Sequence, residues 1–420
     1  MPRLLVLAYY FPPMGLSGVQ RTAKFVKYLP EFGWEPWVVT VGGVAYWAFD
    51  PSMWREVRGS PVLRTPSLDP LWVLGRVGKR REVQARRGTQ DLLVRLHQAF
   101  LVPDNKLGWA PFALRGGMKL LKKRGFGAIY ATGPPFTAHL VGVLLKRRSG
   151  LPLLLDFRDP WSRSPFLSFP SPLHMAVHSL LERVALRAAD LCTVTHKGIK
   201  GVLNLPSRRP PEVVVLPHGF DPDDFRRTVP GGAGKFAVVY TGAFYGRLTP
   251  KYLLEAVRGL LDEYPELREE IELVFVGAFR EEDRELVRRW GLEDVVEATG
   301  YLPHRQSVER LCEAHLAWLM LGRGPFVHVW VPGKLFEYIG AGKPILACVP
   351  EGAAADLVRS VGGTVVPPDD VEAIRGALMA YYRKWRAGEL SPLPEEAVRM
   401  YDRRLLTGRL AGLLDALTGR

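Results

Sequence analysis

Short apolar runs alternate with amphipathic segments along most of the chain. In the first half the apolar runs are residues 4–10, 36–41, 128–133, 151–157, 191–195 and 213–216. Several of the segments between them, such as residues 19–29, place apolar residues three or four positions apart, which is the spacing of a helix face. Continuous apolar strands separated by helices are typical of parallel sheets that are covered on both faces. The pattern therefore predicts an α/β protein.

The same alternation restarts after residue 235. Residues 205–235 are rich in Pro, Gly and charged residues, which marks a boundary between domains. Beyond them, strand-like runs and helix-like segments alternate again up to about residue 386. A chain of 420 residues is also too long for one hydrophobic core. We therefore expect two domains, at residues 1–217 and 236–399, joined by a linker at 218–235.

Residues 45–110 interrupt this pattern and read as irregular and basic. They contain a run of cations at residues 79–87 and an amphipathic stretch at residues 91–102. Their aromatic residues look exposed and are Trp47, Trp54, Trp72, Phe100 and Trp109. Such a basic, amphipathic region is expected to bind an anionic membrane surface reversibly, and the alternative is a solvated basic face.

The charge of the chain is concentrated in its N-terminal part. The formal net charge is +14, and residues 1–170 contain 25 Lys and Arg against 10 Asp and Glu. Such asymmetry points to an acidic partner for this half: anionic lipid, a phosphate-bearing substrate or nucleic acid. No nucleic-acid-binding module is recognisable, so we expect no nucleic-acid partner.

Several features argue for a cytoplasmic protein. No apolar run reaches the roughly 18 residues that a membrane-spanning helix requires. The N-terminus reads as a first strand rather than a secretion signal. Three cysteines, at positions 192, 312 and 348, lie far apart in apolar segments, as expected of buried thiols in a reducing compartment.

The loop after the first strand contains Gly15 and Gly18, which allow a ligand to approach the backbone at a helix tip. It lacks the G-x-G-x-x-G spacing, however. The second strand ends in Thr40-Val-Gly, without the acidic residue that would bind a ribose. The sequence therefore argues against a nicotinamide dinucleotide site.

The stretch VPGKLFEYIGAGKPILACVP, residues 331–350, carries the most specific chemistry. A short helix is expected to begin at Lys334, to end at Gly340-Ala-Gly342, and to lead into a buried strand. Lys334 and Glu337 are three residues apart and therefore share a helix face. The helix tip and the ammonium suit a phosphate, and the carboxylate suits a pair of sugar hydroxyls. The alternative is an ordinary salt-bridged surface helix.

Motifs along the whole chain resemble glycosyltransferase family 4 of the GT-B fold, most closely bacterial enzymes of exopolysaccharide and lipopolysaccharide synthesis. The matching stretches are YYFPPMGLSGVQR, ATGPPFTAH, DFRDPW, VVVLPHGFDPDDF, YTGAFYGR, TGYLPH and PGKLFEYIGAGKPILA. The resemblance implies two Rossmann-like parallel-sheet domains that face a central cleft. It also implies that the final helix, residues 400–420, crosses back to the first domain.

The resemblance also implies roles for residues of the second domain. Glu337 would bind the donor ribose, and Val329 stands where the family has another glutamate. Arg247 and Lys334, with Lys251, would neutralise the diphosphate, because no Asp-x-Asp metal motif appears in a suitable place. Donor contacts are further expected at Gly15, Gly18, Gly242, Leu302 and Gly333.

In the first domain the resemblance places acceptor contacts at Ser17, Gly133 and Asp159. His139, near the start of a helix, is expected to be neutral and to act on a sugar hydroxyl, and the alternative is a satisfied buried histidine. For Asp159 the alternative is a helix cap or a salt bridge to Arg158 or Arg163.

The resemblance implies a retaining, metal-independent glycosyltransferase without a cofactor. It would move a sugar from a nucleotide-diphosphate donor to a glycan or lipid-linked acceptor at the cytoplasmic membrane face. Two alternatives stay open: a GT-B-type UDP-sugar 2-epimerase, and a non-catalytic binding protein on the same scaffold. The sequence does not specify the nucleotide, the sugar, the acceptor, the linkage or the oligomeric state.

Overall fold

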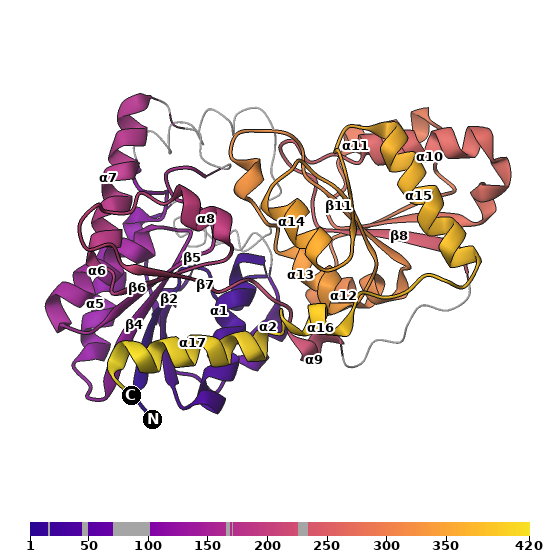
Figure 1. The fold of residues 1–420 in the computed structure, drawn as a ribbon. Coiled ribbons are helices and arrows are strands. Elements are labelled where there is room, and N and C mark those ends of the chain that lie inside the picture. The colour runs from indigo at the N-terminus through magenta and orange to yellow at the C-terminus, as the bar shows by residue number, and fades with distance from the viewer. Residues whose placement is uncertain (16, 44–48, 70–100, 165–168, 170, 226–233) are drawn as a thin grey trace. The chain divides into compact units, whose positions relative to one another are not determined.

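The structure is a computed structural model that describes residues 1–15, 17–43, 49–69, 101–164, 169, 171–225 and 234–420. These residues form two compact units (Figure 1). The first unit comprises Met1–Pro217 together with Arg404–Arg420, and the second unit comprises His218–Arg403. The chain therefore passes between the units twice, after Pro217 and after Arg403.

A seven-stranded parallel sheet forms the centre of the first unit. Its strands, in spatial order, are β3 (Val62–Thr65), β2 (Glu35–Val41), β1 (Arg3–Leu7), β4 (Phe126–Gly133), β5 (Leu153–Phe157), β6 (Leu191–Val194) and β7 (Glu212–Val215). Every residue of β5 and β6 is buried, as expected of strands that are covered on both faces. The helices of this unit are α1 (Ser17–Tyr28), α2 (Pro51–Glu56), α5 (Ala110–Leu121), α6 (Thr137–Ser149), α7 (Pro172–Ala188), α8 (Lys197–Val202) and α17 (Arg403–Thr418), with short 3-10 helices η1 (Leu29–Phe32) and η2 (Leu107–Trp109).

The second unit contains a six-stranded parallel sheet. Its strands, in spatial order, are β10 (Val296–Gly300), β9 (Ile271–Val276), β8 (Phe236–Thr241), β11 (Leu316–Met320), β12 (Ile345–Cys348) and β13 (Thr364–Val366). The helices are α9 (Pro222–Phe225), α10 (Lys251–Glu263), α11 (Glu281–Arg289), α12 (His304–Glu313), α13 (Lys334–Gly340), α14 (Ala353–Ser360), α15 (Val371–Arg386) and α16 (Glu395–Arg399), with 3-10 helices η3 (Pro265–Glu269) and η4 (Val327–Val329). The two Rossmann-like sheets predicted from the alternating pattern are thus confirmed.

The last helix completes the first unit. Figure 1 shows α17, in yellow, beside the strands of that unit, and its Leu406, Leu410 and Leu414 are part of the first hydrophobic core. Trp34 Nε1 donates a hydrogen bond of 2.9 Å to Asp415 Oδ1. The predicted return of the C-terminal helix to the first domain is therefore confirmed. The described part of the predicted linker, residues 218–225 and 234–235, belongs to the second unit and includes α9.

Part of the stretch that the sequence presented as irregular is ordered. Residues 51–56 form α2, and residues 62–65 form the edge strand β3, which pairs with β2. Trp109 looked exposed but is fully buried, with its Nε1 donating to Thr65 Oγ1 at 2.9 Å, and Trp54 is half-buried. The exposure expected for these two was wrong because the short edge strand covers them. Trp47, Trp72, Phe100, the basic run at 79–87 and residues 91–100 lie outside the described residues.

The cysteines and the helix lengths can be compared with what the sequence predicts. Cys192, Cys312 and Cys348 are all buried, as predicted. Among the described residues, no helix combines the length and the apolar character that crossing a membrane would require.

Candidate functional site

The order of strands in the second unit reverses between β8 and β11. In sheets of this kind, ligands bind at such a switch point, beyond the carboxyl ends of the strands. Gly242 directly follows β8, and its φ of +113° lies in the region that favours glycine. A Cβ at this position would lie 2.8 Å from Lys334 Nζ. The structure therefore brings the predicted Gly242 and Lys334 together at the switch point, and a side chain at position 242 would displace the ammonium from where it lies.

The Lys334 ammonium occupies an unusual environment. Its Nζ lies 3.6 Å from the centroid of the Tyr240 ring, an arrangement in which the ring face attracts a cation. Burial lowers the pKa of Lys334 to about 7, although the charge of Glu337 acts in the opposite direction. A cation that is poorly solvated gains more than an exposed one from an anionic ligand, because it has little hydration to lose.

Helix α13, which carries Lys334, is fixed to the end of β8. The Tyr338 hydroxyl accepts a hydrogen bond of 2.9 Å from the Thr241 backbone N–H. Leu335, Phe336 and Ile339 are buried on the other sides of the helix. The helix then ends in a turn in which Gly342 has a φ of +64°. The ammonium therefore projects from a helix whose position is set by the core.

Arg247 lies on the loop after β8 and packs against the loop after β11. A Cβ on Gly322 would come within 2.5 Å of the Arg247 carbonyl oxygen, so the two loops touch through a glycine. The exposed Arg247 guanidinium donates a 2.7 Å hydrogen bond from Nη1 to the Arg323 carbonyl oxygen. Lys251, also exposed, is the first residue of α10. Both predicted cations thus follow β8, as Gly242 does.

Glu337 stands one turn after Lys334, and a histidine faces it. His304 Nδ1 lies 3.6 Å from Glu337 Oε1, and His304 Nε2 lies 3.2 Å from Asp224 Oδ2. The imidazole is therefore placed between a carboxylate of α13 and one of α9. Leu302, two residues before His304, is half-buried in the loop between β10 and α12.

The sequence also indicated two positions on either side of residue 331, Val329 and Gly333. Gly333 is exposed and directly precedes α13. Val329, which replaces an expected glutamate, is only 4% exposed and lies in η4. The side chain at position 329 is therefore part of the core.

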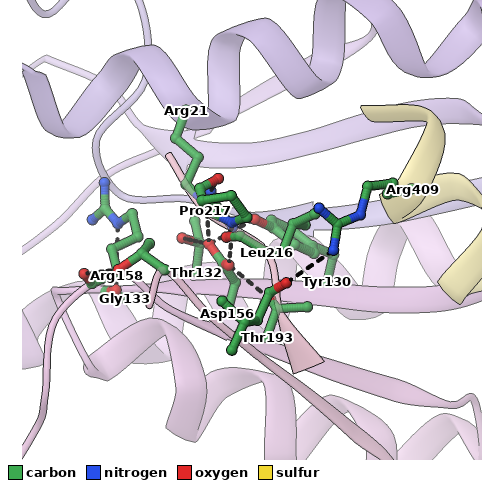
Figure 2. Close-up of polar contacts among 12 residues, drawn as sticks. Arg21, Tyr130, Thr132, Gly133, Asp156, Arg158, Thr193, Leu216, Pro217 and Arg409 are labelled. Atoms are coloured by element: carbon green, nitrogen blue, oxygen red, sulfur yellow. Dashed lines mark hydrogen bonds and ion pairs between the residues drawn. The ribbon is translucent and has the colours of Figure 1, made fainter. Parts of the chain in front are cut away.

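The first unit has its own switch point, between β1 and β4. The buried Arg158 guanidinium donates hydrogen bonds to the carbonyl oxygens of Gly18 and Pro134, and its Nε donates to Gly133 at 3.3 Å. One side chain thus joins the start of α1, where Gly18 lies, to the end of β4 and the loop after it, and Figure 2 shows Arg158 beside Gly133. The structure brings the predicted Gly18 and Gly133 together in this way.

The remaining predicted residues of the first unit lie near the same strand ends. Gly15 is in the loop between β1 and α1, and Ser17 is the first residue of α1. Asp159 follows Arg158 in the loop after β5 and is half-buried. Burial raises the pKa of the Asp159 carboxyl, whereas the neighbouring Arg158 charge lowers it.

His139 is fully buried at the start of α6. It is surrounded by aromatic rings, with centroids of Phe157 at 4.5 Å and Phe136 at 5.5 Å. Its Nε2 is 3.2 Å from the Asp156 carbonyl oxygen, and its Nδ1 has no hydrogen-bond partner among the residues that the structure describes. Burial lowers the pKa of His139 to about 4, so the ring is neutral at pH 7. This burial favours the interpretation of His139 as a core histidine beneath the Gly133 loop.

A buried ion pair lies under the first-unit site. Asp156 Oδ1 and Oδ2 accept hydrogen bonds from Arg21 Nη2 at 2.8 Å and Nε at 3.0 Å, and neither side chain is more than 1% exposed. Three hydroxyls also donate to the carboxylate, from Tyr130 at 2.8 Å, Thr132 at 2.8 Å and Thr193 at 2.7 Å (Figure 2). Burial alone would raise the pKa of Asp156, but the Arg21 charge and these hydrogen bonds outweigh it and hold the pKa well below its usual range.

Sequence reasoning missed Arg21, Asp156, Arg158, Asp224 and His304. A signal existed for Asp156, because a carboxylate at the end of the apolar run LPLLLDF must have a partner inside the protein. The identity of that partner, 135 residues earlier in the chain, could not be read from spacing. The same holds for His304, which meets Asp224 from 80 residues away.

Comparison with known proteins adds to these observations. Residues 236–384 match the family model described as "Glycosyl transferases group 1". Over 180 residues, the chain is 27% identical to the putative colanic acid biosynthesis glycosyltransferase WcaL of Escherichia coli K12. That match covers 41% of this chain and 44% of the relative, so less than half of either protein is compared.

Solved structures resemble the chain over its full length. A glycosyltransferase from Rickettsia africae superposes with a TM-score of 0.67 at 12% identity, covering 99% of this chain and 98% of that one. Anabaena Alr3699/HepE, solved in complex with UDP and glucose, gives 0.61 at 17% identity, with coverage of 99% and 100%. The GT-B fold predicted from the motifs is therefore confirmed, as is the resemblance to bacterial glycosyltransferases. Assignment to family 4 in particular stays a prediction.

Proposed function

We propose that the protein is a glycosyltransferase that moves a sugar from a nucleotide-diphosphate donor, bound in the second unit, to a glycan or lipid-linked acceptor bound in the first unit. The observation that carries the proposal is the Lys334 ammonium beside Gly242 at the switch point of the second sheet. It lies inside the segment that matches group 1 glycosyltransferases. The UDP bound by Anabaena Alr3699/HepE supports a nucleotide-linked donor.

The proposed chemistry depends on charge at the leaving group. As the bond between the sugar and the diphosphate breaks, negative charge grows on the phosphate oxygens, and fixed cations stabilise it. Lys334 and Arg247 supply these cations from the chain itself. Retention of configuration would follow from attack on the front face, with the departing phosphate accepting the proton of the acceptor hydroxyl. No separate protein base is then required.

The first unit would bind the acceptor beside the segments that Arg158 joins. Backbone amide and carbonyl groups near Gly18 and Gly133 would meet sugar hydroxyls, and Asp159 would add a carboxylate from the loop after β5. His139 would support the Gly133 loop from below: a Cβ on Gly133 would lie 3.0 Å from its Nε2, so the two are in close contact. The excess of cations in residues 1–170 fits a lipid-linked acceptor at an anionic membrane surface.

Nucleotide binding tests the proposal directly. Thermal-shift assays and isothermal titration calorimetry with UDP, GDP, ADP and TDP test which nucleotide binds. We expect one of the four to raise the unfolding temperature of the protein, which identifies the base of the donor. Glu337→Ala is expected to weaken that nucleotide by about 10- to 100-fold, because charge-assisted hydrogen bonds to the ribose are lost. The loss of affinity caused by Glu337→Ala should be smaller for the 2′,3′-dideoxy nucleotide, which lacks the two ribose hydroxyls. Glu372→Ala, on the exposed face of α15, is the matched control.

Two outcomes would contradict this assignment. Binding of none of the four nucleotides would exclude the proposed donor site altogether. If Glu337→Ala bound the nucleotide as tightly as the wild type does, Glu337 would not bind the ribose.

The pH dependence of donor binding provides a second test. Because the pKa of Lys334 in the free protein is about 7, raising the pH above that value removes its charge before the donor binds. The affinity for the sugar nucleotide of the base identified by the binding screen is therefore expected to fall with rising pH, by up to about tenfold per pH unit, whereas the ligand's diphosphate does not titrate in that range. Titration calorimetry between about pH 6 and about pH 9 measures the slope. A slope that persists in Lys334→Met would show that another group is responsible.

The buried Val329 gives one reason to consider a second function. If the missing carboxylate abolishes activity, the protein is a nucleotide-sugar-binding protein without turnover. One experiment distinguishes the transferase from the binding protein. The protein with bound donor is incubated with total lipid extract, and the released nucleoside diphosphate is measured. Release that depends on the extract supports the transferase, and tight binding without release supports the binding protein.

A further inference from the structure

Helix α7 carries buried polar side chains on one face and exposed apolar side chains on the other. Its inward face carries two polar side chains, His178 and Glu182, which are 4% and 1% exposed. Both are satisfied there: Trp161 Nε1 donates to His178 Nδ1 at 3.2 Å, and Ser162 Oγ donates to Glu182 Oε2 at 2.6 Å. Asn204 Nδ2 also donates to Glu182, at 2.5 Å. The helix therefore packs on the first unit through these polar contacts together with the buried Ala185 and Leu186.

The outward face of α7 is apolar. Leu173 is 71% exposed and Leu180 is 57% exposed, and at seven residues apart they lie on the same stripe. The half-buried Val177 and Val184 continue this stripe along the helix. Met175, in the first turns, is 48% exposed. An amphipathic helix normally turns such residues inward, so the fold of the unit does not account for this apolar stripe.

Charge indicates what covers the stripe. Arg183 and Arg187 flank it on the exposed surface of α7, and the single acidic residue of the helix, Glu182, is buried. Arg163, also exposed, lies in the loop that packs against the inward face and donates to Val202 at the end of α8. Leucines bordered by arginines, without an exposed acid on the helix, match the boundary between acyl chains and anionic headgroups.

We propose that the outward face of α7 is a docking surface for an anionic lipid bilayer. The helix would lie in the plane of the interface, with Leu173 and Leu180 inserted and Arg183 and Arg187 at the level of the phosphates. The overall charge of +14 favours an anionic surface over a second copy of this cationic chain. The purpose of the contact, bringing a lipid-linked acceptor to the enzyme, rests on the proposed function, but the contact itself requires no substrate.

Vesicle sedimentation of the full chain tests the docking surface. Vesicles of phosphatidylglycerol mixed with phosphatidylcholine are compared with phosphatidylcholine alone. Leu173→Gln combined with Leu180→Gln is expected to lower binding to the anionic vesicles by at least about tenfold. Arg183→Gln and Arg187→Gln are each expected to lower it by about fivefold. Met400→Gln, at a site 65% exposed in the second unit, is the matched control and should bind as the wild type does.

A fluorescent label at the surface distinguishes this contact from binding elsewhere. The natural cysteines are buried, so Leu180→Cys can be labelled selectively with an environment-sensitive dye. Its emission is expected to shift to the blue with anionic vesicles, whereas the same dye at Met400→Cys should not shift. Absence of the shift, or full vesicle binding by the leucine double variant, overturns the proposal and would place any binding in another segment, such as residues 79–87.

Two further outcomes also overturn the proposal. A blue shift without vesicles that grows with protein concentration would identify a second copy as the occupant. No binding to either vesicle would show that the stripe does not bind lipid. Nucleotide affinity, measured in parallel on the same variants, should be unchanged, so a failure of the docking surface is distinguishable from a failure of the proposed function.

Discussion

Replacing Lys334 with alanine is expected to lower the rate of sugar transfer by about 10²- to 10³-fold, the size of effect found when one fixed donor to a developing negative charge is removed. The ammonium is held between the Tyr240 ring and the Gly242 turn, and α13 is fixed to β8 through Tyr338. Little reorganisation is therefore required when the charge develops. An exposed lysine on a flexible loop would not have this advantage.

The measurement is the release of nucleoside diphosphate from the donor that the binding experiments identify, in the presence of lipid extract. Lys384→Ala, on the exposed surface of α15, controls for the loss of a positive charge. Thermal unfolding of both variants should stay close to that of the wild type, because the Lys334 side chain is anchored at the edge of the core and not inside it. Transfer by Lys334→Ala at near the wild-type rate would end the proposed role of this helix.

The second large effect is expected on stability. Arg21→Met and Asp156→Asn should each destabilise the first unit by about 3–5 kcal/mol, because each leaves a buried partner without its counter-charge. In Asp156→Asn, the neutral amide replaces the carboxylate that three hydroxyls and the Arg21 guanidinium stabilise. Arg21 in turn would lose a partner while still donating to the carbonyl oxygens of Leu216 at 3.0 Å and Pro217 at 2.7 Å.

Hydrogen exchange of peptides from β4, β5 and β6 measures this loss in the first unit alone, which avoids the assumption that both units unfold together. Glu35→Gln, in the half-exposed pair with Arg3, should cost at most about 1 kcal/mol. The double variant Arg21→Met, Asp156→Asn should be less destabilised than the sum of the two single changes. Strict additivity would show that the pair is not coupled.

Much of the fold could be predicted because the strands are apolar throughout. Runs such as residues 151–157 indicate a strand without any knowledge of its neighbours, and the alternation with helices then specifies parallel sheets. The edge strand β3 was missed because four residues between Pro61 and Pro66 carry no clear periodicity. What identifies it is pairing with β2, which is a tertiary contact. Its absence from the prediction is also why Trp109 seemed exposed.

The candidate site was predictable where one short stretch contains both the geometry and the chemistry. Lys334, Glu337 and the glycines after them lie within nine residues, so spacing along a helix places them. Arg158 and His304 could not be assigned in this way, since their partners come from loops far away in the sequence. The exposure of Leu173 and Leu180 on α7 was equally hidden, because an apolar stripe at helical spacing indicates a helix but not which way the stripe faces.

The second unit is inserted into the first, which has a consequence for synthesis. A ribosome working from the amino end completes residues 218–403 before it makes α17, so the inserted unit is able to fold while its host is still unfinished. Until then the surface that Leu406, Leu410 and Leu414 cover is open to solvent or to a chaperone. Removal of the last 17 residues, 404–420, would accordingly destabilise the first unit, although most of it is made first. The second unit, residues 218–403, would keep all of its residues.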